Sequence, residues 1–385
     1  MELRKCWKRR IFRQTEIGIQ EKEFNENAMF RLKLIQISEN PLIVRREFVG
    51  NPIAEFSETF DKFMGYYRLK DLVSCDELHK RPLAPKKERI CRFCKATYSK
   101  DEKFKSKAHL VPDLLGNDHL LSDFECDKCN NLFGKIYEND LANFLGVSRA
   151  MFIGNAWKGS LKFKSPDKTF IVMKDKETPA DIPKLRLESH EEENDHFTLD
   201  AENKKITFHT IRHSYNPHHV YKAFLKIGLS ILPQTDVKEY SIALAMLLSE
   251  KKNEEPDNPM YKMNMYVHPG PAFPCPLVLF FEKKNKMQPV PMHIVCIMFH
   301  NHTYQLVLPL NKQDKWMYDG KTTITVPNMP PFIDKHFAKK FGNPKEHRLN
   351  FNLDELKKGE KHDITYTFED HLDTRYPTTA PLKKE

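Results

Sequence analysis

The chain has 385 residues, of which 40% are hydrophobic and 30% charged, and its formal net charge is +9. This length exceeds what one hydrophobic core usually serves, so we expect more than one domain. The hydrophobic content and the 27 phenylalanines exclude a disordered chain. No apolar run reaches about 18 residues, so we expect no membrane-spanning helix and no membrane partner.

Residues 1–88 are predicted to form an N-terminal arm or small subdomain followed by a linker. Alternating residues at 31–37 predict a strand, and the aromatic-rich segment 56–67 predicts a helix. The stretch 80–87 contains two prolines and is typical of a linker. Six basic residues lie between positions 4 and 13. They fit either an arm on a nucleic-acid backbone or a frayed N-terminus.

Two C-x2-C pairs, which we call knuckles, come next in the chain. Their two-residue spacing lets both sulfurs of a knuckle reach one ion, so four thiolates predict a structural Zn²⁺ site. Disulfides are the alternative, but a C-x2-C bridge closes a strained ring. The basic N-terminus also lacks the apolar stretch of a signal peptide. We therefore expect zinc, and a reducing cytoplasm, for Cys91, Cys94, Cys126 and Cys129.

The knuckles and the residues around them are predicted to form a compact unit at 89–148. His109 lies between the knuckles, flanked by Ala108 and Leu110, and a turn is predicted at 116–118. After Cys129, apolar residues recur at helical spacing up to Gly146, which is placed to end that helix. We therefore predict a knuckle, a ribbon that carries His109, a turn, the second knuckle and a helix.

Positive charge is concentrated before and within the first knuckle. From Lys80 to Lys107 there are eleven Lys or Arg residues against three acids. Such charge binds phosphate backbones, although a solvated lysine face is the alternative. Beside a metal-held unit we favour nucleic acid. The predicted backbone contacts are Lys86, Lys87, Arg89, Arg92 and Lys95.

Residues 149–385 are predicted to form a larger α+β domain of unknown role in recognition, partner binding or regulation. Helices are expected at 217–232 and 237–248, with strands near 161–164, 170–173, 184–187, 206–209, 277–281, 293–299 and 304–308. His300 and His302 on one strand would point both rings to one face, which makes them a candidate second metal site. Glycine-rich phosphate loops of the two common kinds do not occur in the sequence.

Residues 91–146 resemble the HNH endonuclease family. The branch concerned has the signature C-x2-C, A-H-x-x-P, G-N and E-C-D-x-C-N-x-x-F-G. The chain supplies these parts at Cys91, Cys94, Ala108-His109, Pro112, Gly116-Asn117, Glu125-Cys126-Asp127, Cys129-Asn130 and Phe133-Gly134. The resemblance implies a ββα-metal module, in which a ribbon and a helix grip a divalent ion. Several bacterial relatives of this branch act in defence against phage.

The resemblance also implies two catalytic roles. The ribbon histidine of the family is the general base, which maps to His109, and an imidazole titrates in the range suited to that task. The metal-ligand asparagine follows the last cysteine, which maps to Asn130. Its amide oxygen suits Mg²⁺ or Mn²⁺. The alternatives are a histidine that only fills the ribbon and an asparagine that caps the helix start.

One departure from the family concerns the position before the base. Many members have a carboxylate or a second histidine there that also binds the ion, whereas this chain has Ala108. Another oxygen should then come from Asp123 or Glu125. Glu138 lies eight residues beyond Asn130, about 12 Å along a regular helix, so direct sharing of one ion is not expected. The residues that compete for the middle polar position of the motif are Asn117, Ser122 and Asp123.

Taken together, these features predict an α+β, metal-dependent HNH endonuclease that hydrolyses DNA, with RNA as an open alternative. Anti-phage defence is the setting that the resemblance suggests. The missing ligand leaves open a zinc-stabilised protein that binds nucleic acid without cutting it. A third hypothesis is an effector nuclease gated through residues 149–385 by a signal, by homo-oligomerisation or by a defence-system partner.

Overall fold

The computed structural model describes most of the chain. The described residues are 21–22, 31–36, 44–49, 54–76, 83–117, 119–151, 162–174, 185–189, 196–249, 259–270, 272–273, 275–318, 326–331 and 335–368. The predicted arm at 4–13 and residues 80–82 of the predicted linker lie outside them. Among the described helices, none is long and apolar enough to cross a membrane.

Helices and strands are mixed throughout the described chain, which confirms the predicted α+β class. The helices are α1 (Ala54–Tyr66), α2 (Asp127–Leu132), α3 (Asn139–Leu145), α4 (Pro217–Ile231), α5 (Ser241–Leu248) and α6 (Lys335–Phe341). The strands are β1 (Glu21–Lys22), β2 (Arg31–Gln36), β3 (Val44–Val49), β4 (Tyr67–Ser74), β5 (Lys162–Lys164), β6 (Phe170–Lys174), β7 (Leu185–Ser189), β8 (Phe197–Asp200), β9 (Lys205–Ile211), β10 (Lys262–Val267), β11 (Leu277–Lys283), β12 (His293–Phe299), β13 (His302–Val307), β14 (Lys345–Asn350) and β15 (Lys361–Thr367).

A six-stranded antiparallel sheet forms the centre of the molecule, with the order β14-β10-β13-β12-β11-β4. Strand β4 comes from the N-terminal part of the chain and pairs with β11, more than 200 residues later. Strand β12 lies in the middle of the sheet, and all seven of its residues are buried. A strand that is apolar on both faces requires cover on both sides of the sheet.

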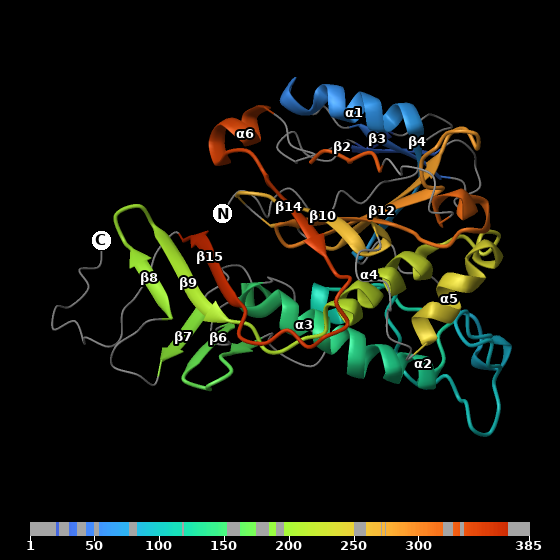
Figure 1. Cartoon of the computed structure of the whole chain (residues 1–385), viewed down its shortest axis with the longest axis horizontal. Coiled ribbons are helices and arrows are strands. Elements are labelled where there is room, and N and C mark those ends of the chain that lie inside the picture. Colours follow the sequence, from blue (N-terminus) through green and yellow to red (C-terminus); the bar gives the residue numbers. More distant parts are fainter. Residues whose placement is uncertain are drawn as a thin grey trace, which may run out of the picture.

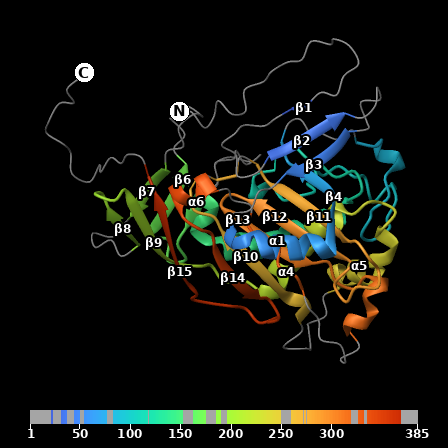
Figure 2. The same cartoon turned by 90° about the horizontal axis from the view of Figure 1, so that it is seen from above.

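That cover consists of helices on the two faces (Figures 1 and 2). On β11, Leu277, Leu279 and Phe281 pack in a cluster with α1, whereas Val278 and Phe280 pack in a cluster with α4. Because successive strand residues point to opposite faces, this alternation places α1 and α4 on opposite sides. The sheet is therefore the middle layer between two layers of helix.

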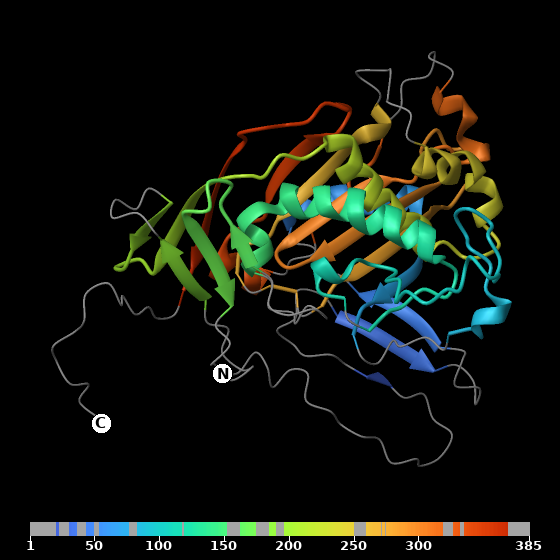
Figure 3. The ribbon, with the colours of Figure 1, turned by 90° about the horizontal axis from the view of Figure 1, so that it is seen from below.

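The helix after the second knuckle forms the outermost layer on the α4 side. It runs through α2, a π-helical segment η5 (Phe133–Glu138) and α3, and it ends at Gly146, whose φ is +56°. The predicted helix end at Gly146 is thus confirmed. Figure 3 shows this long helix beside α4 and across the strands. Its apolar residues belong to the same core cluster as α4 and the sheet.

Three smaller sheets lie outside this central body. Their orders are β1-β2-β3, β5-β6-β7 and β15-β9-β8. A separate apolar cluster, with Phe163, Phe170 and Phe208 at its centre, joins the last two sheets to the helical turn 146–151. The predicted division at 88 and 148 stays a prediction, while the described residues show one core shared between 91–145 and the central sheet.

Candidate functional site

The four cysteines of the two knuckles come together into one cluster, which we call the cysteine cluster. Their Sγ atoms all lie within 4.8 Å of one another. The Sγ atoms of Cys91 and Cys129 are 3.8 Å apart, and those of Cys94 and Cys126 are 3.5 Å apart. A tetrahedral Zn²⁺ with Zn–S bonds of about 2.3 Å places its sulfurs about 3.8 Å apart. A disulfide needs about 2.05 Å, so the cysteine cluster fits a zinc ion and could bind one.

Local hydrogen bonds fix both knuckles around this cluster. In the first knuckle the Cys91 N–H donates to the Ala96 carbonyl at 2.8 Å. In the second, Cys126 is the N-cap of α2, and its Sγ accepts the Cys129 N–H at 3.5 Å. The carboxylate of Glu102 also accepts the N–H groups of Asp127 and Lys128. Negative groups at a helix N-terminus are stabilised by the helix dipole, which favours thiolates there.

The predicted ribbon that carries His109 is present. His109 pairs with Leu121 in an antiparallel bridge. The adjacent backbone bonds run from Leu110 N–H to the Leu120 carbonyl and from Ser122 N–H to the Ala108 carbonyl. Both neighbours of His109 are buried at 1% exposure, whereas His109 itself is half-buried. The ribbon therefore presents the imidazole on its more open side.

Asn117 closes the end of the ribbon. Its side-chain amide donates to the carbonyls of Val111 and Leu120, and its Oδ1 accepts the Leu120 N–H at 2.8 Å. The side chain is fully buried. Among the residues that competed for the middle polar position, Asn117 thus holds the loop, while the Ser122 hydroxyl accepts the Phe124 N–H.

A buried lysine on α4 lies directly beneath the ribbon. The Lys226 ammonium donates to the His109 carbonyl at 2.6 Å. It also lies 3.3 Å from the Glu125 carboxylate and 3.8 Å from that of Glu138. We call these three charged side chains the lysine cluster. It joins the ribbon, the second knuckle and the helix of residues 127–145 to α4.

Burial perturbs both carboxylates of the lysine cluster. The Glu125 side chain has no exposed surface, and burial raises its pKa to about 7 against the lowering effect of Lys226. Burial also raises the pKa of Glu138, again opposed by Lys226, while the charge of Asp113 raises it further. A single ammonium therefore offsets the fully buried Glu125 carboxylate and the half-buried Glu138 carboxylate, and removing it would leave both unpaired.

The structure places the predicted metal-ligand residues around this ribbon and helix. Asn130 is half-buried in the body of α2, and its N–H makes the regular helical bond to Cys126. Because Cys126 caps that helix, the alternative that Asn130 caps the helix start is wrong. Asp123 accepts the Ala84 N–H at 2.9 Å, which ties the segment before the first knuckle to the ribbon. Glu138 points into the lysine cluster.

The predicted nucleic-acid contacts divide into two groups. Lys86 and Lys87 are exposed on a short 3-10 helix just before the first knuckle. Lys95 is exposed, although its ammonium donates to the Arg92 carbonyl, and the half-buried Arg89 donates to the Ala84 carbonyl. Lys86, Lys87 and Lys95 are therefore exposed basic residues close to the first knuckle in the chain.

Arg92 lies differently from what a phosphate contact requires. It is 8% exposed, and its guanidinium donates to three carbonyls at the C-terminal end of α4: Leu229, Ser230 and Leu232. The guanidinium also stacks over the Phe124 ring at 3.8 Å. A cation at a helix C-terminus satisfies orphan carbonyls and the dipole. Arg92 therefore docks the first knuckle on α4 rather than facing solvent.

The suggested metal site at His300 and His302 rests on a wrong assumption about the backbone. His300 has a φ of +51° and lies in the turn before β13, so the two residues do not share a strand. The rings stack 6.1 Å apart, and the His300 Nε2 bonds to the Met151 carbonyl. Burial lowers both pKa values, to about 3 for His300 and about 4 for His302. They are neutral core histidines.

Comparison with known proteins gives one match, and it falls on this site. Residues 91–144 match the family model described as HNH endonuclease. This segment is similar to HNH endonuclease domains. The match begins at the first cysteine of the cluster and ends within α3, so it spans the ribbon, the knuckles and the helix. No curated protein and no solved structure matches the chain.

The family match confirms the resemblance inferred from the motifs, and it indicates a nuclease that acts on nucleic acid. Lys226 is the residue of this site that sequence reasoning missed. It lies about 80 residues beyond the HNH segment, inside an apolar helix where the surrounding pattern predicts only core. The one sequence signal was that a lysine interrupts the buried face of α4, which needs a paired charge.

Proposed function

We propose that this protein is a metal-dependent endonuclease that hydrolyses phosphodiester bonds in DNA. The observation that carries the proposal is the HNH match at residues 91–144, together with a ribbon histidine placed between two knuckles whose sulfurs converge. In this proposal zinc in the cysteine cluster is structural. The cluster is closed by four sulfurs and keeps no open position for a substrate.

His109 is the proposed general base. It accepts a proton from the attacking water, which needs a neutral imidazole nitrogen within hydrogen-bond reach. The Lys226 bond to the His109 carbonyl and the paired ribbon on either side support this role, because they fix the backbone from which the imidazole projects. A base held in one position contributes to the rate through its orientation.

Asn130 is the proposed ligand for a catalytic Mg²⁺ or Mn²⁺. When bound, such an ion neutralises charge on the scissile phosphate and on the leaving oxygen. One amide oxygen is too little for tight binding, so the proposal needs further oxygens. Glu138 and Asp123 are the proposed sources. The Lys226 ammonium contacts both the Glu138 carboxylate and the His109 carbonyl, so Glu138 lies near the proposed base although it stands eight residues from Asn130.

DNA is the proposed substrate, and exposed Lys86 and Lys87 are the proposed backbone contacts, with Arg89 and Lys95 beside them. Four free thiols as zinc ligands need a reducing compartment, which supports the cytoplasm. A role in anti-phage defence is the most specific part of the proposal, and it rests on the family resemblance. It is tested by plaque counts on cells that carry the intact gene or its His109→Ala variant.

A gated effector nuclease is a second candidate, favoured by one observation. The ribbon and the first knuckle are both bonded to α4, through Lys226 and Arg92. Any partner or signal that moves α4 would therefore move the proposed base. This candidate predicts a purified protein that is silent until cell or phage extract is added.

The test is a cleavage assay on supercoiled plasmid, single-stranded DNA and RNA with Mg²⁺ or Mn²⁺. We expect plasmid nicking that EDTA abolishes, and a loss of about 100- to 10,000-fold in His109→Ala, the range for a general base. Zinc content and the circular dichroism spectrum should not change. Equal cutting by His109→Ala would remove His109 from the mechanism. DNA retention without cutting under any divalent ion would instead support a binding protein.

A further inference from the structure

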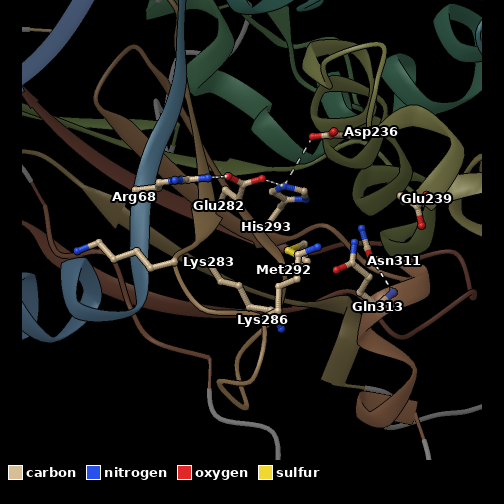
Figure 4. A pocket seen from close by; sticks show the side chains of 11 residues that line it. Arg68, Asp236, Glu239, Glu282, Lys283, Lys286, Met292, His293, Asn311 and Gln313 are labelled. Atoms are coloured by element: carbon tan, nitrogen blue, oxygen red, sulfur yellow. Dashed lines mark hydrogen bonds and ion pairs between the residues drawn. The ribbon is translucent and has the colours of Figure 1, made fainter.

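A second polar cluster lies far along the chain from the HNH segment, at the β4 edge of the central sheet. Asp236 follows α4, Glu282 is on β11 and His293 begins β12. One ligand atom from each of the three lies within 4.8 Å of the others. They line a cavity of about 230 Å³, and Figure 4 shows Glu282 and Asp236 on either side of the His293 ring.

Positive charge already occupies the middle of this cluster. The Lys70 ammonium on β4 lies 2.7 Å from both Asp236 Oδ2 and Glu282 Oε1. The same two oxygens face His293 Nε2, at 4.0 and 3.7 Å. The Lys70 side chain is 25% exposed, and its flexible four-carbon stem can withdraw into solvent. The site is thus built for a cation, and a lysine is its internal occupant.

His293 is the group that ion pairing with Lys70 does not explain. Its side chain is 3% exposed, and its Nε2 is buried without a hydrogen bond to any of the described residues. The other ring nitrogen, Nδ1, lies 2.6 Å from the Tyr240 hydroxyl, and the ring stacks on Phe280. A histidine fixed through one nitrogen, with the other aimed at two carboxylates, is the usual arrangement of a metal-binding imidazole.

We propose that Asp236, Glu282 and His293 bind a divalent transition metal of the Mn²⁺ or Zn²⁺ class, in competition with the Lys70 ammonium. One imidazole nitrogen and two carboxylate oxygens favour these ions over Ca²⁺ or Mg²⁺, which prefer oxygen alone. On binding, the Nδ1–H donates to the Tyr240 oxygen so that the Nε2 lone pair faces the metal. The ion links β11, β12 and the turn after α4.

This site would act on the same turn that the HNH segment grips. Arg92 of the first knuckle bonds to the carbonyls of residues 229, 230 and 232, and Asp236 follows four residues later. A metal at Asp236 therefore fixes the chain just beyond the point where Arg92 holds it. The proposal does not depend on cleavage activity, so its failure would leave the nuclease proposal unaffected.

The experiment is equilibrium dialysis of the zinc-loaded full chain against Mn²⁺, with bound metal counted by elemental analysis. Wild type should bind one equivalent more than Asp236→Asn or His293→Gln, and Mn²⁺ should raise its melting temperature by more than it raises theirs. Lys70→Met should bind the added equivalent at least tenfold more tightly, because the competing ammonium is gone. Glu239→Gln is the matched control, since Glu239 lines the same cavity outside the ligand group, and it should match wild type.

Two outcomes would overturn the proposal. Equal Mn²⁺ uptake by wild type, Asp236→Asn and Lys70→Met would show that the cluster is a structural ion-pair network and binds no metal. Weaker uptake in Lys70→Met would contradict the competition between lysine and metal. If His293→Gln proves unfolded by circular dichroism, the more exposed Asp236→Asn still decides the result.

Discussion

The HNH segment and the central sheet are stabilised in different ways. Residues 91–129 form knuckles, turns and a short ribbon, and they are held by the cysteine cluster, by Glu102 at the start of α2 and by Asn117 in the loop. The sheet is held by burial on both faces, and β12 is buried along its whole length. Both regions share one apolar core, but the HNH segment adds these polar and thiol contacts where it has little helix or strand.

The difference assigns the proposed catalytic groups to the HNH segment and its structural support to the central sheet and α4. The segment with little regular helix or strand of its own carries the proposed catalytic groups, and Lys226 and Arg92 fix it to α4. We therefore expect single polar changes to disable the segment while the sheet persists. Changes in the sheet should act through stability.

Removal of the metal ligands should have the largest effect. In Cys126→Ser the zinc site loses one ligand and α2 loses its N-cap, so zinc should be lost and cleavage should fall at least 100-fold. Hydrogen exchange should show lost protection in α2 with retained protection in β12. Equal loss of protection in both elements would contradict the difference between the two regions.

Lys226→Met should have the next largest effect. It leaves the fully buried Glu125 without its cation, which costs about 3–5 kcal/mol for a broken buried pair, and it also removes the cation beside Glu138. It also frees the His109 carbonyl. We expect lower stability by urea unfolding and a reduced kcat with little change in KM, because the proposed base is displaced rather than the substrate contacts.

Lys222→Met is the matched control for that prediction. Lys222 is also buried on α4, one turn earlier, but its ammonium donates to the Ser249 carbonyl, away from the ribbon. The Lys222→Met variant should be less stable than wild type but should keep the wild-type kcat under conditions where it is folded. A double variant, Lys226→Met with Glu125→Gln, should recover part of the stability. An equal loss of kcat in both lysine variants would show that Lys226 has no positioning role.

Acid should weaken the sheet region through buried histidines. Burial lowers the pKa of three histidines at or beside β10, β12 and β13 to about 3 or 4: His268, His300 and His302. Their unfolded pKa is about 6.5, so unfolding takes up protons below that pH. Stability is then present above pH 6.5 and is lost as the pH falls toward 4.

The measurement is urea unfolding between pH 7 and pH 4.5. His302→Gln should flatten the decline by about 1.4 kcal/mol per pH unit, which corresponds to one proton. His347→Gln should change the slope much less, because His347 is exposed on β14 and acts on His302 only through its charge. A slope unchanged in His302→Gln would count against the assignment.

Sequence reasoning succeeded where the determining contacts are local. The C-x2-C spacing, the turn that contains Asn117 and the apolar helix ending at Gly146 each depend on residues within a few positions. It could not find the pairing of β4 with β11, because no local pattern encodes a partner more than 200 residues away. Lys226 was missed for the same reason, since its partners come from another part of the chain.

Arg92 shows the same limit, because here a sequence pattern predicted a contact that the fold does not allow. Its place in a basic run suggested a phosphate contact, and only the docking of α4 explains its burial. Charge in a sequence indicates a binding face only when the fold leaves that charge exposed.

The smallest expected effect concerns the exposed lysines before the first knuckle. Lys86→Ala with Lys87→Ala should weaken DNA binding uniformly across sequences and reduce the slope of log K against log salt by about 2, one for each lost phosphate contact. Stability should not change, since both side chains are exposed. An unchanged salt slope would move the nucleic-acid path elsewhere on the surface.

Chemical rescue of His109→Gly tests the central claim most directly. The variant should retain zinc and the wild-type spectrum, and it should cut plasmid at least 100-fold more slowly than wild type. Added imidazole should then restore cutting in proportion to its concentration, as a free base replacing the lost ring. Cutting that is indifferent to imidazole, or as fast in His109→Gly as in wild type, would contradict the role of His109.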